Sequence, residues 1–456
     1  MKPEHSKQLQ HLYWRAGFGI TSMKLHQKGK PIEEAIKLIK QARRVQKIPN
    51  MPTSGNGSGM MNGQAQRRSE RKLTGEINAH WVEYMSKTNN PLLERMSLFW
   101  HDHFACRIVN SKMALNYIDA IRSNALGNFR DLLLAVSKST AMIRYLNNQQ
   151  NRKQRPNENF AREVMELFTL GRNNYTEKDI KEAARAFTGW SSNKQHDFEF
   201  RSKFHDTGQK NFMGITGNFK GEDIINIILS KKETAHYIVS KIYKYFVNEK
   251  APSKRIKNLG DYFYRKDYDI GALMQKIFTS SWFYDPENIG TKIKSPIDFL
   301  VGLMKTIDLE FKSHKTILFV EKALGQVLFN PPNVAGWQGN KAWIDNATLL
   351  FRLNFVGFLF NRVEMSLKVK EGLEDKKLNR KVKKLIGEVS TNRLVKAFSK
   401  YKEAEISTVM TAVLLQPKVM IQPDFINQYT SNNSTKADYI ESLAYRLMST
   451  PEYQMC

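Results

Sequence analysis

One short segment, residues 156–171, most constrains what this chain can fold into. Pro156 precedes it, Asn157 is expected to cap a helix there, and Gly171 follows the last apolar residue, as is usual just past a helix C-terminus. Beside its apolar stripe the helix would carry a polar one, because residues three and four apart are neighbours. The polar stripe consists of Asn159, Arg162, Glu163 and Glu166. A surface helix does not need such a stripe, so the segment predicts a polar site.

The rest of the chain also has mainly helical periodicity. Helices are expected within 5–45 (two helices), 74–148, 157–170, 177–189, 221–248, 253–283, 294–309, 344–364, 375–402, 405–415 and 434–448. Phe198, Phe200 and Phe204 alternate with polar residues, which predicts a short β-hairpin excursion at 195–219. We therefore expect a mainly α, multi-helix globular body, with residues 1–456 forming a single large helical domain.

Residues 48–75 depart from the helical pattern. They contain Pro49, Pro52 and the glycine- and serine-rich run 54–59, and they end in the basic cluster 67–72. Such a composition predicts a flexible loop insertion. The loop could cover a site, but a passive surface loop is the favoured interpretation.

The chain is strongly basic, with 71 Lys and Arg against 44 Asp and Glu, a formal net charge of +27. This balance favours polyanions, including nucleic acid, or an acidic substrate as partners. The lysines are spread along the whole chain, however, and the usual nucleic-acid recognition motifs are missing. Many of these lysines are therefore expected only to solvate helices, including those of the Lys-rich stretch 367–384.

Neither the cysteines nor the apolar runs indicate export or membrane insertion. Cys106 and Cys456 are too few for a disulfide framework. The N-terminus is polar, and the longest apolar runs are far shorter than the roughly 20 residues of a spanning helix. We expect no integral membrane segment and a cytoplasmic location by default.

Two histidine-containing segments are candidate ligand sources. His101 and His103 lie about 200° apart on an ideal helix, so they could reach one metal ion together only if the helix ends or bends there. His205 and Asp206 follow a strand-like stretch and could add a third ligand or a proton-transfer pair. The alternatives are core histidines and a turn in which Asp206 bonds its own backbone.

The paired carboxylates of Glu163 and Glu166 suit either a metal or general acid–base chemistry. Arg162 would partly offset the repulsion between them. An Arg–Glu network between helices, with Glu182 and Arg185 as further members, is an equally strong alternative. The sequence lacks a Gly-x-Ser-x-Gly elbow and a Cys–His signature, which disfavours serine and thiol hydrolases.

Several segments, in order along the chain, resemble the bacterial proteins grouped as domain of unknown function 1800. They are His11–Gly19, Phe99–Ala105, 156–171, Tyr175–Glu177 with Ala184–Trp190, His205–Lys210, Pro331–Trp337 and Ser449–Gln454. The resemblance implies a site but no reaction. It also implies that His is common where this chain has Phe168, which weakens the metal hypothesis. Members are often encoded beside a sulfatase-like exported protein, which implies a possible partner.

The sequence therefore predicts an enzyme-like polar site of hydrolase or oxidoreductase type, and leaves open whether the protein is an enzyme. The expected catalytic residues are Glu163, Glu166, Arg162 and Asp206. The expected ligands of a divalent metal ion are His101, His103, His205 and Glu163. Two alternatives remain, an assembly partner of a sulfatase-like exported protein and a basic polyanion or nucleic-acid binder.

Overall fold

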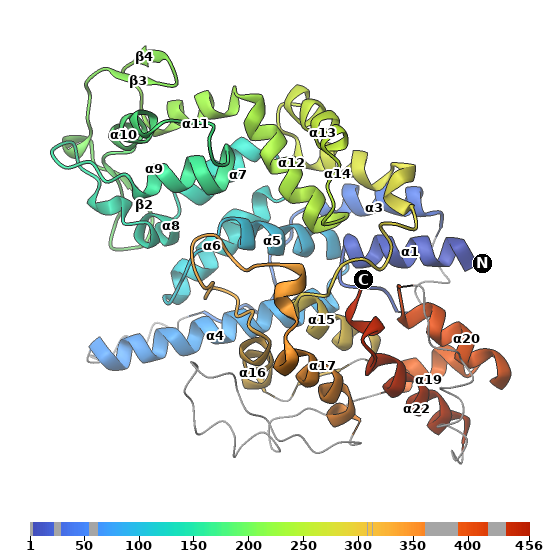
Figure 1. The fold of residues 1–456 in the computed structure, drawn as a ribbon. Helices are drawn as coiled ribbons and strands as arrows, with labels where there is room; N and C mark the ends of the chain where they lie inside the picture. The colour runs from blue at the N-terminus through green and yellow to red at the C-terminus, as the bar shows by residue number, and fades with distance from the viewer. Residues whose placement is uncertain are drawn as a thin grey trace.

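Helix α5 (Pro91–His103) lies at the centre of the computed structural model (Figure 1). The structure describes residues 3–21, 29–53, 63–307, 309–311, 313–360, 391–417 and 435–456. Every residue of α5 except Asp102 is buried. A helix buried on all sides belongs to the core of a large protein. Pro91 occupies its first turn, where the missing N–H costs nothing.

Two adjacent charged residues of α5 are buried and tie it to three other helices. Glu94 accepts a hydrogen bond from Arg122 Nη2 at 2.8 Å and another from the indole of Trp81 at 2.8 Å. Arg95 forms an ion pair with Asp298. Since a buried charge must be paired and hydrogen-bonded to be tolerated, these contacts specify which helices pack against α5.

The helices before α9 follow the predicted pattern with one difference. They are α1 (Pro3–Arg15), α3 (Pro31–Ala42), α4 (Gly63–Lys87), α5, α6 (Ser111–Asn124), α7 (Phe129–Ser137) and α8 (Thr140–Tyr145), followed by the 3₁₀ turn η1 (Asn148–Gln150). The prediction of two helices within 5–45 is confirmed. Residues 63–75, expected as loop, belong to α4 instead, because the buried residues Ile77, Trp81 and Met85 recur at helical spacing beyond them. Residues 54–62 lie outside the described residues.

The segment 156–171, with its predicted polar stripe, forms α9 (Asn159–Glu163), which continues as the π-helical turn η2 (Val164–Thr169). Gly171 ends it with φ +74°, as predicted. The capping prediction was wrong by one residue: Glu158 precedes the helix, and Asn157 Oδ1 accepts from Asn159 N at 3.0 Å.

Helix α10 (Glu177–Ala186) follows, and Thr176 caps it in a capping box with Asp179, as its sequence indicates. The β excursion is confirmed but is more elaborate than one hairpin. Antiparallel pairs are formed by β1 (Trp190–Ser192) with β2 (Phe198–Phe200) and by β3 (Lys210–Phe212) with β4 (Ile215–Gly217), with the 3₁₀ turn η3 (Ser202–Phe204) between the pairs. The excursion therefore begins at Trp190, earlier than 195.

The remaining elements are again helical, which confirms the mainly α class. They are α11 (Gly221–Leu229), α12 (Lys232–Phe246), α13 (Ser253–Arg265), α14 (Ile270–Phe278), η4 (Ser281–Tyr284), α15 (Pro296–Thr306), α16 (His314–Leu324), η5 (Asn340–Trp343), α17 (Asn346–Leu359), α19 (Asn392–Phe398), α20 (Glu403–Leu414), α22 (Lys436–Met448) and η6 (Glu452–Gln454). Most of the helix expected at 375–402, and the Lys-rich stretch 367–384, lie outside the described residues.

Figure 1 shows α7 to α14 on one side of α5 and α6, and α4 with α15 to α22 on the other. Residues 454–456 pair with residues 292–294 through backbone hydrogen bonds. Lys294 N donates to Gln454 O at 2.8 Å, and Cys456 N donates to Lys292 O at 2.7 Å. Among the described residues, no helix is both long and apolar enough to cross a membrane.

The irregular segment 330–343 is fastened to the end of α5. Trp337 N donates to Asp102 Oδ1 at 2.9 Å. Gly336 has φ +82°, and a Cβ there would overlap Asp102 Oδ1 and lie 2.6 Å from the Asp102 carbonyl oxygen. Only glycine combines this conformation with so close an approach.

Replacing Gly336 with Ala should therefore lower the free energy of unfolding by about 2–4 kcal/mol, since backbone strain and steric overlap add. Urea denaturation monitored by circular dichroism would measure it. The matched control is Gly339→Ala, where a Cβ meets nothing within 4 Å. Equal effects of the two substitutions would contradict the proposed contact with Asp102.

Candidate functional site

His101 and His103 do not share a site in this structure. His101 Nε2 accepts from Phe329 N at 3.3 Å, and its ring stacks on that of Trp337 with centroids 5.7 Å apart. His103 Nε2 donates to the carbonyl oxygen of Phe168 at 3.1 Å. α5 remains helical through both residues, so their side chains diverge as an ideal helix requires.

Both imidazoles are neutral packing groups. Burial lowers the pKa of His101 to about 3 and the pKa of His103 well below the usual value. Phe99, Trp100 and Phe104 surround His103 with aromatic rings. This arrangement is the core-histidine alternative considered from the sequence.

The polar stripe on α9 and η2 is largely an ion-pair network. Arg162 makes two hydrogen bonds of 2.8 Å to Glu177 and one of 3.4 Å to Glu158. Glu166 accepts from Arg172 Nε at 2.7 Å, and this bond is the first cause that holds the pKa of Glu166 below its usual value. Arg162 and Glu166 therefore already have partners.

Glu163 differs from its neighbours on the stripe. It is half-buried, and no hydrogen bond or ion pair involves its side chain in the part of the chain that the structure describes. Burial, and then the charge of Glu166, raise the pKa of Glu163. A partly enclosed carboxyl group without a partner is available for proton transfer.

His205 and Asp206 form an anchored turn rather than a proton-transfer pair. Asp206 accepts from Arg185 Nε at 2.8 Å and from Gly208 N at 2.8 Å. Burial opposes ionisation of Asp206, but these bonds outweigh it and lower the pKa. His205 Nδ1 lies 2.9 Å from the Thr188 carbonyl oxygen, and burial lowers its pKa.

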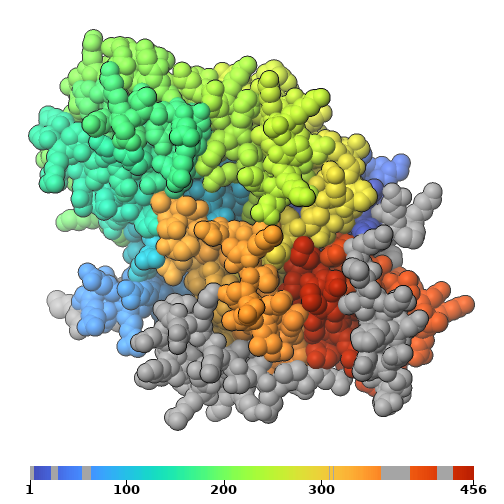
Figure 2. All heavy atoms as spheres, viewed as in Figure 1, coloured from blue at the N-terminus to red at the C-terminus, as the bar shows by residue number. Residues whose placement is uncertain are grey.

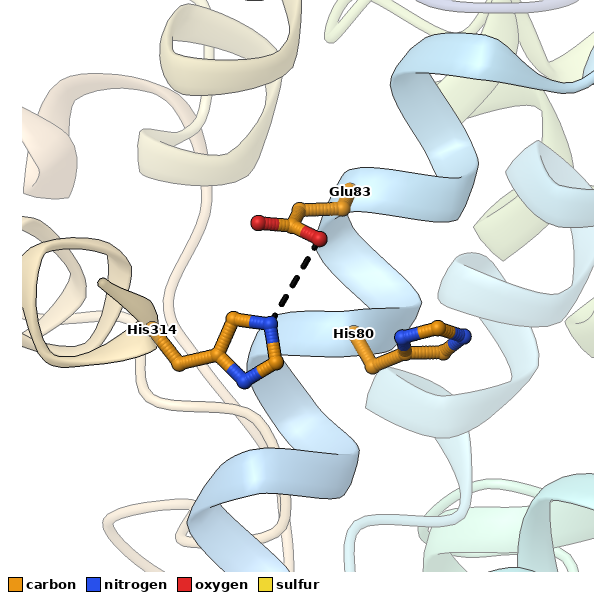
Figure 3. A group of neighbouring side chains, drawn as sticks. All are labelled: His80, Glu83 and His314. Atoms are coloured by element: carbon orange, nitrogen blue, oxygen red, sulfur yellow. Dashed lines mark ion pairs between the residues drawn. The ribbon is translucent and has the colours of Figure 1, made fainter. Parts of the chain in front are cut away.

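The four predicted metal ligands, His101, His103, His205 and Glu163, are not brought together. Among the described residues, one group of three His, Cys, Asp or Glu side chains has ligand atoms close enough to hold a metal ion. It consists of His80, Glu83 and His314, from α4 and α16 (Figure 3). The sequence did not predict this group, because no periodicity joins residues 83 and 314.

Asp102, between the two histidines of α5, was not among the residues predicted from the sequence. It is half-buried. One carboxylate oxygen accepts from Trp337 N, and the other has no hydrogen-bond partner among the described residues. Burial raises the pKa of Asp102 to about 6, although the Trp337 bond and the charge of Lys241 oppose the rise. An acidic residue at a helix C-terminus is electrostatically unfavourable, and this signal could have singled out Asp102.

Lys241 of α12 is the cation that acts on Asp102. Its side chain is half-buried, and its Nζ lies 5.3 Å from the centre of the Tyr237 ring. Burial is the main cause that lowers the pKa of Lys241, and the charge of Asp102 opposes the change. Burial therefore disfavours the charged form of both the carboxyl group and the amine.

Together the fold and its polar clusters define a mainly α-helical protein with buried ion pairs around its central helix. The chain belongs to the family described as "Protein of unknown function (DUF1800)", whose sequence profile matches residues 11–455. The match spans all the segments that carried the resemblance. Comparisons with curated proteins and with solved structures found no match.

Replacing Arg185 with Met should lower the free energy of unfolding by about 2–4 kcal/mol, because it would leave Glu182 enclosed without its cation and Asp206 with only the more distant Lys210, whose Nζ lies 3.9 Å away. Chemical denaturation would measure the loss. The control is Arg172→Met, which removes an exposed ion pair and should change stability little. A larger effect at Arg172 would contradict this assignment.

Stability should also fall in acid because of the buried histidines. The pKa of His101 is about 3 in the folded chain, against 6.5 for a free imidazole, so only the unfolded chain takes up this proton between those values. The variant His101→Gln lacks this titrating group, so only the wild type loses the corresponding stability in acid. The difference in free energy of unfolding between the wild type and the variant should therefore shrink by about 1.4 kcal/mol for each pH unit below about pH 6. Urea titrations from pH 7 to pH 4 would measure it, and a constant difference would show that His101 titrates normally.

Proposed function

We propose that this protein is an enzyme of hydrolase type whose acid–base pair is Asp102 and Lys241. The geometry around Asp102 carries the proposal: its Oδ1 accepts from Trp337 N at 2.9 Å, and its other carboxylate oxygen has no hydrogen-bond partner among the described residues. Burial also disfavours the charged forms of Asp102 and Lys241. A carboxyl group with a pKa of about 6 is an efficient general base or acid near neutral pH. Two segments that carry the family resemblance, around His101–His103 and Pro331–Trp337, meet at this pair.

The surroundings of Asp102 suit proton transfer at one defined atom. Trp337 N–H holds Oδ1 at 2.9 Å, so the carboxylate is oriented and the other oxygen can accept a proton from a substrate or a water molecule. The ammonium of Lys241 would donate a proton or stabilise developing negative charge. Gly336 keeps the loop against Asp102 without a side chain that would displace it.

Access for a substrate is supported by the molecular surface. Figure 2 shows a hollow between the yellow-green helices that include α12 and the orange segment near residue 330, with blue atoms of the α5–α6 region at its floor. Among the catalytic residues expected from the sequence, Glu163 has no hydrogen-bond or ion-pair partner within the described residues, and it stays a second candidate acid. Glu166, Arg162 and Asp206 are engaged in ion pairs.

Binding of a polyanion, or of a sulfatase-like exported protein, is the competing proposal. The formal net charge of +27 supports it. If charge alone drives binding, the protein should be retained on heparin in a salt-sensitive way. The conservative variant Asp102→Asn should then change the salt dependence of retention by no more than the effect of one added charge. Capture of an acidic partner independently of Asp102 and Lys241 would favour this proposal.

The acid–base pair predicts a measurable titration. In carboxyl-carbon NMR spectra, Asp102 should titrate near pH 6, and its pKa should rise in Lys241→Met because the neighbouring positive charge is removed. With generic ester and phosphodiester substrates, the hydrolysis rate should change with pH, with an apparent pKa near 6. Asp102→Asn, which keeps an acceptor for Trp337 N–H, should reduce the rate about 100-fold or more.

The control variant is Glu166→Gln, which changes a carboxylate already paired with Arg172. An unchanged hydrolysis rate in both Asp102→Asn and Lys241→Met would contradict the proposal. So would titration of Asp102 near pH 4, since the carboxylate would then be an ordinary surface acid.

A further inference from the structure

We propose that one divalent transition-metal ion of the zinc class binds between α4 and α16, held by His80, Glu83 and His314. One ligand atom from each residue lies within 4.8 Å of the others. The inference does not rest on the proposed acid–base pair, because it uses different residues on different helices.

The helical frame presents these ligands together. His80 and Glu83 are three residues apart on α4, so they share one stripe of that helix. His314 is the first residue of α16. The two helices are joined by a buried hydrogen bond of 2.7 Å from Asn78 Nδ2 to Glu321 Oε2. Ligands on packed helices are held more precisely than ligands on loops.

The hydrogen bond of His80 prepares its ring for a metal. His80 Nε2 lies 2.8 Å from the carbonyl oxygen of Pro49, so this nitrogen carries the proton and Nδ1 has a free lone pair. Figure 3 shows one ring nitrogen of His80 on the side of Glu83 and His314, and the other turned away from them. Metal-binding histidines are typically oriented through their second nitrogen in this way.

His314 and Glu83 already face each other. His314 Nε2 lies 3.5 Å from Glu83 Oε2, which is longer than a strong charged hydrogen bond. An ion between them would replace this weak pair with two coordinate bonds. The rings of His80 and His314 are nearly perpendicular, with centroids 6.4 Å apart, so neither ring stacks over the other and blocks the site.

The donor set indicates the class of ion. Two imidazoles and one carboxylate suit zinc and neighbouring transition metals, whereas magnesium and calcium prefer oxygen ligands alone. All three side chains are partly exposed, which gives the ion access from solvent. Three protein ligands would leave a fourth position of a tetrahedral ion for water.

The experiment is a zinc chloride titration of chelator-treated full-length protein, prepared without a histidine tag and followed by calorimetry or competition with a chromophoric chelator. We expect about one ion per chain, with micromolar or tighter affinity. His314→Gln and Glu83→Gln should each weaken binding roughly tenfold or more. Cobalt substitution should give the visible absorption of a four-coordinate site and lose it in the same variants.

The matched control is His236→Gln, because His236 Nε2 pairs with Asp261 Oδ1 at 3.0 Å and no third ligand joins them in the described part of the chain. It should leave zinc affinity unchanged. Failure of the wild type to bind zinc at micromolar concentrations would overturn the proposal. So would equal affinity in His314→Gln, Glu83→Gln and the wild type, because the bound zinc would then lie elsewhere. Circular dichroism of each variant confirms that loss of binding is not loss of fold.

Discussion

The buried ion pairs of α5 are the constraint on which the rest of the molecule depends. Glu94 and Arg95 are neighbours in sequence with opposite charge, so they point to different sides of the helix and require different partners, Arg122 and Asp298. Removing one member of such a pair costs about 3–5 kcal/mol, because the other charge is left buried and unpaired. Asp102 lies in the last turn of the same helix, so these two contacts also set the position of the proposed acid.

Other buried cations contact neutral groups instead of carboxylates, and some of their nitrogen atoms have no hydrogen-bond partner among the described residues. Arg15 donates to the Asn288 carbonyl oxygen at 2.9 Å, and Arg352 donates to that of Lys294 at 2.9 Å. The Nζ of Lys294 lies 3.5 Å from the ring centre of Tyr453 and 4.1 Å from that of Trp14. Burial lowers the pKa of Lys294 to about 7. A neutral Lys294 would lower the formal net charge of +27 by one unit only, so the chain stays strongly basic.

Local features of the sequence predicted the helices well, while long-range contacts decided the site. The Thr176 cap and the Gly171 terminus depend only on neighbouring residues, so the sequence contains them. The divergence of His101 and His103 also followed from helical spacing alone. By contrast, periodicity shows which face of a helix is polar but not which helix it meets. The partner of Asp206 on α10, the loop over Asp102, and the approach of His314 to His80 therefore became visible only in three dimensions.

The two cysteine thiols can distinguish local unfolding from global unfolding of this protein. Cys106 is enclosed beside the central helix, whereas Cys456 belongs to the terminal segment paired with Lys292 through two backbone hydrogen bonds. A thiol reagent reaches neither side chain until its surroundings separate. Detachment of the terminal segment would expose Cys456 alone, whereas loss of the central packing would expose Cys106. The order in which the thiols are labelled would therefore distinguish fraying at the chain end from cooperative disruption of the core.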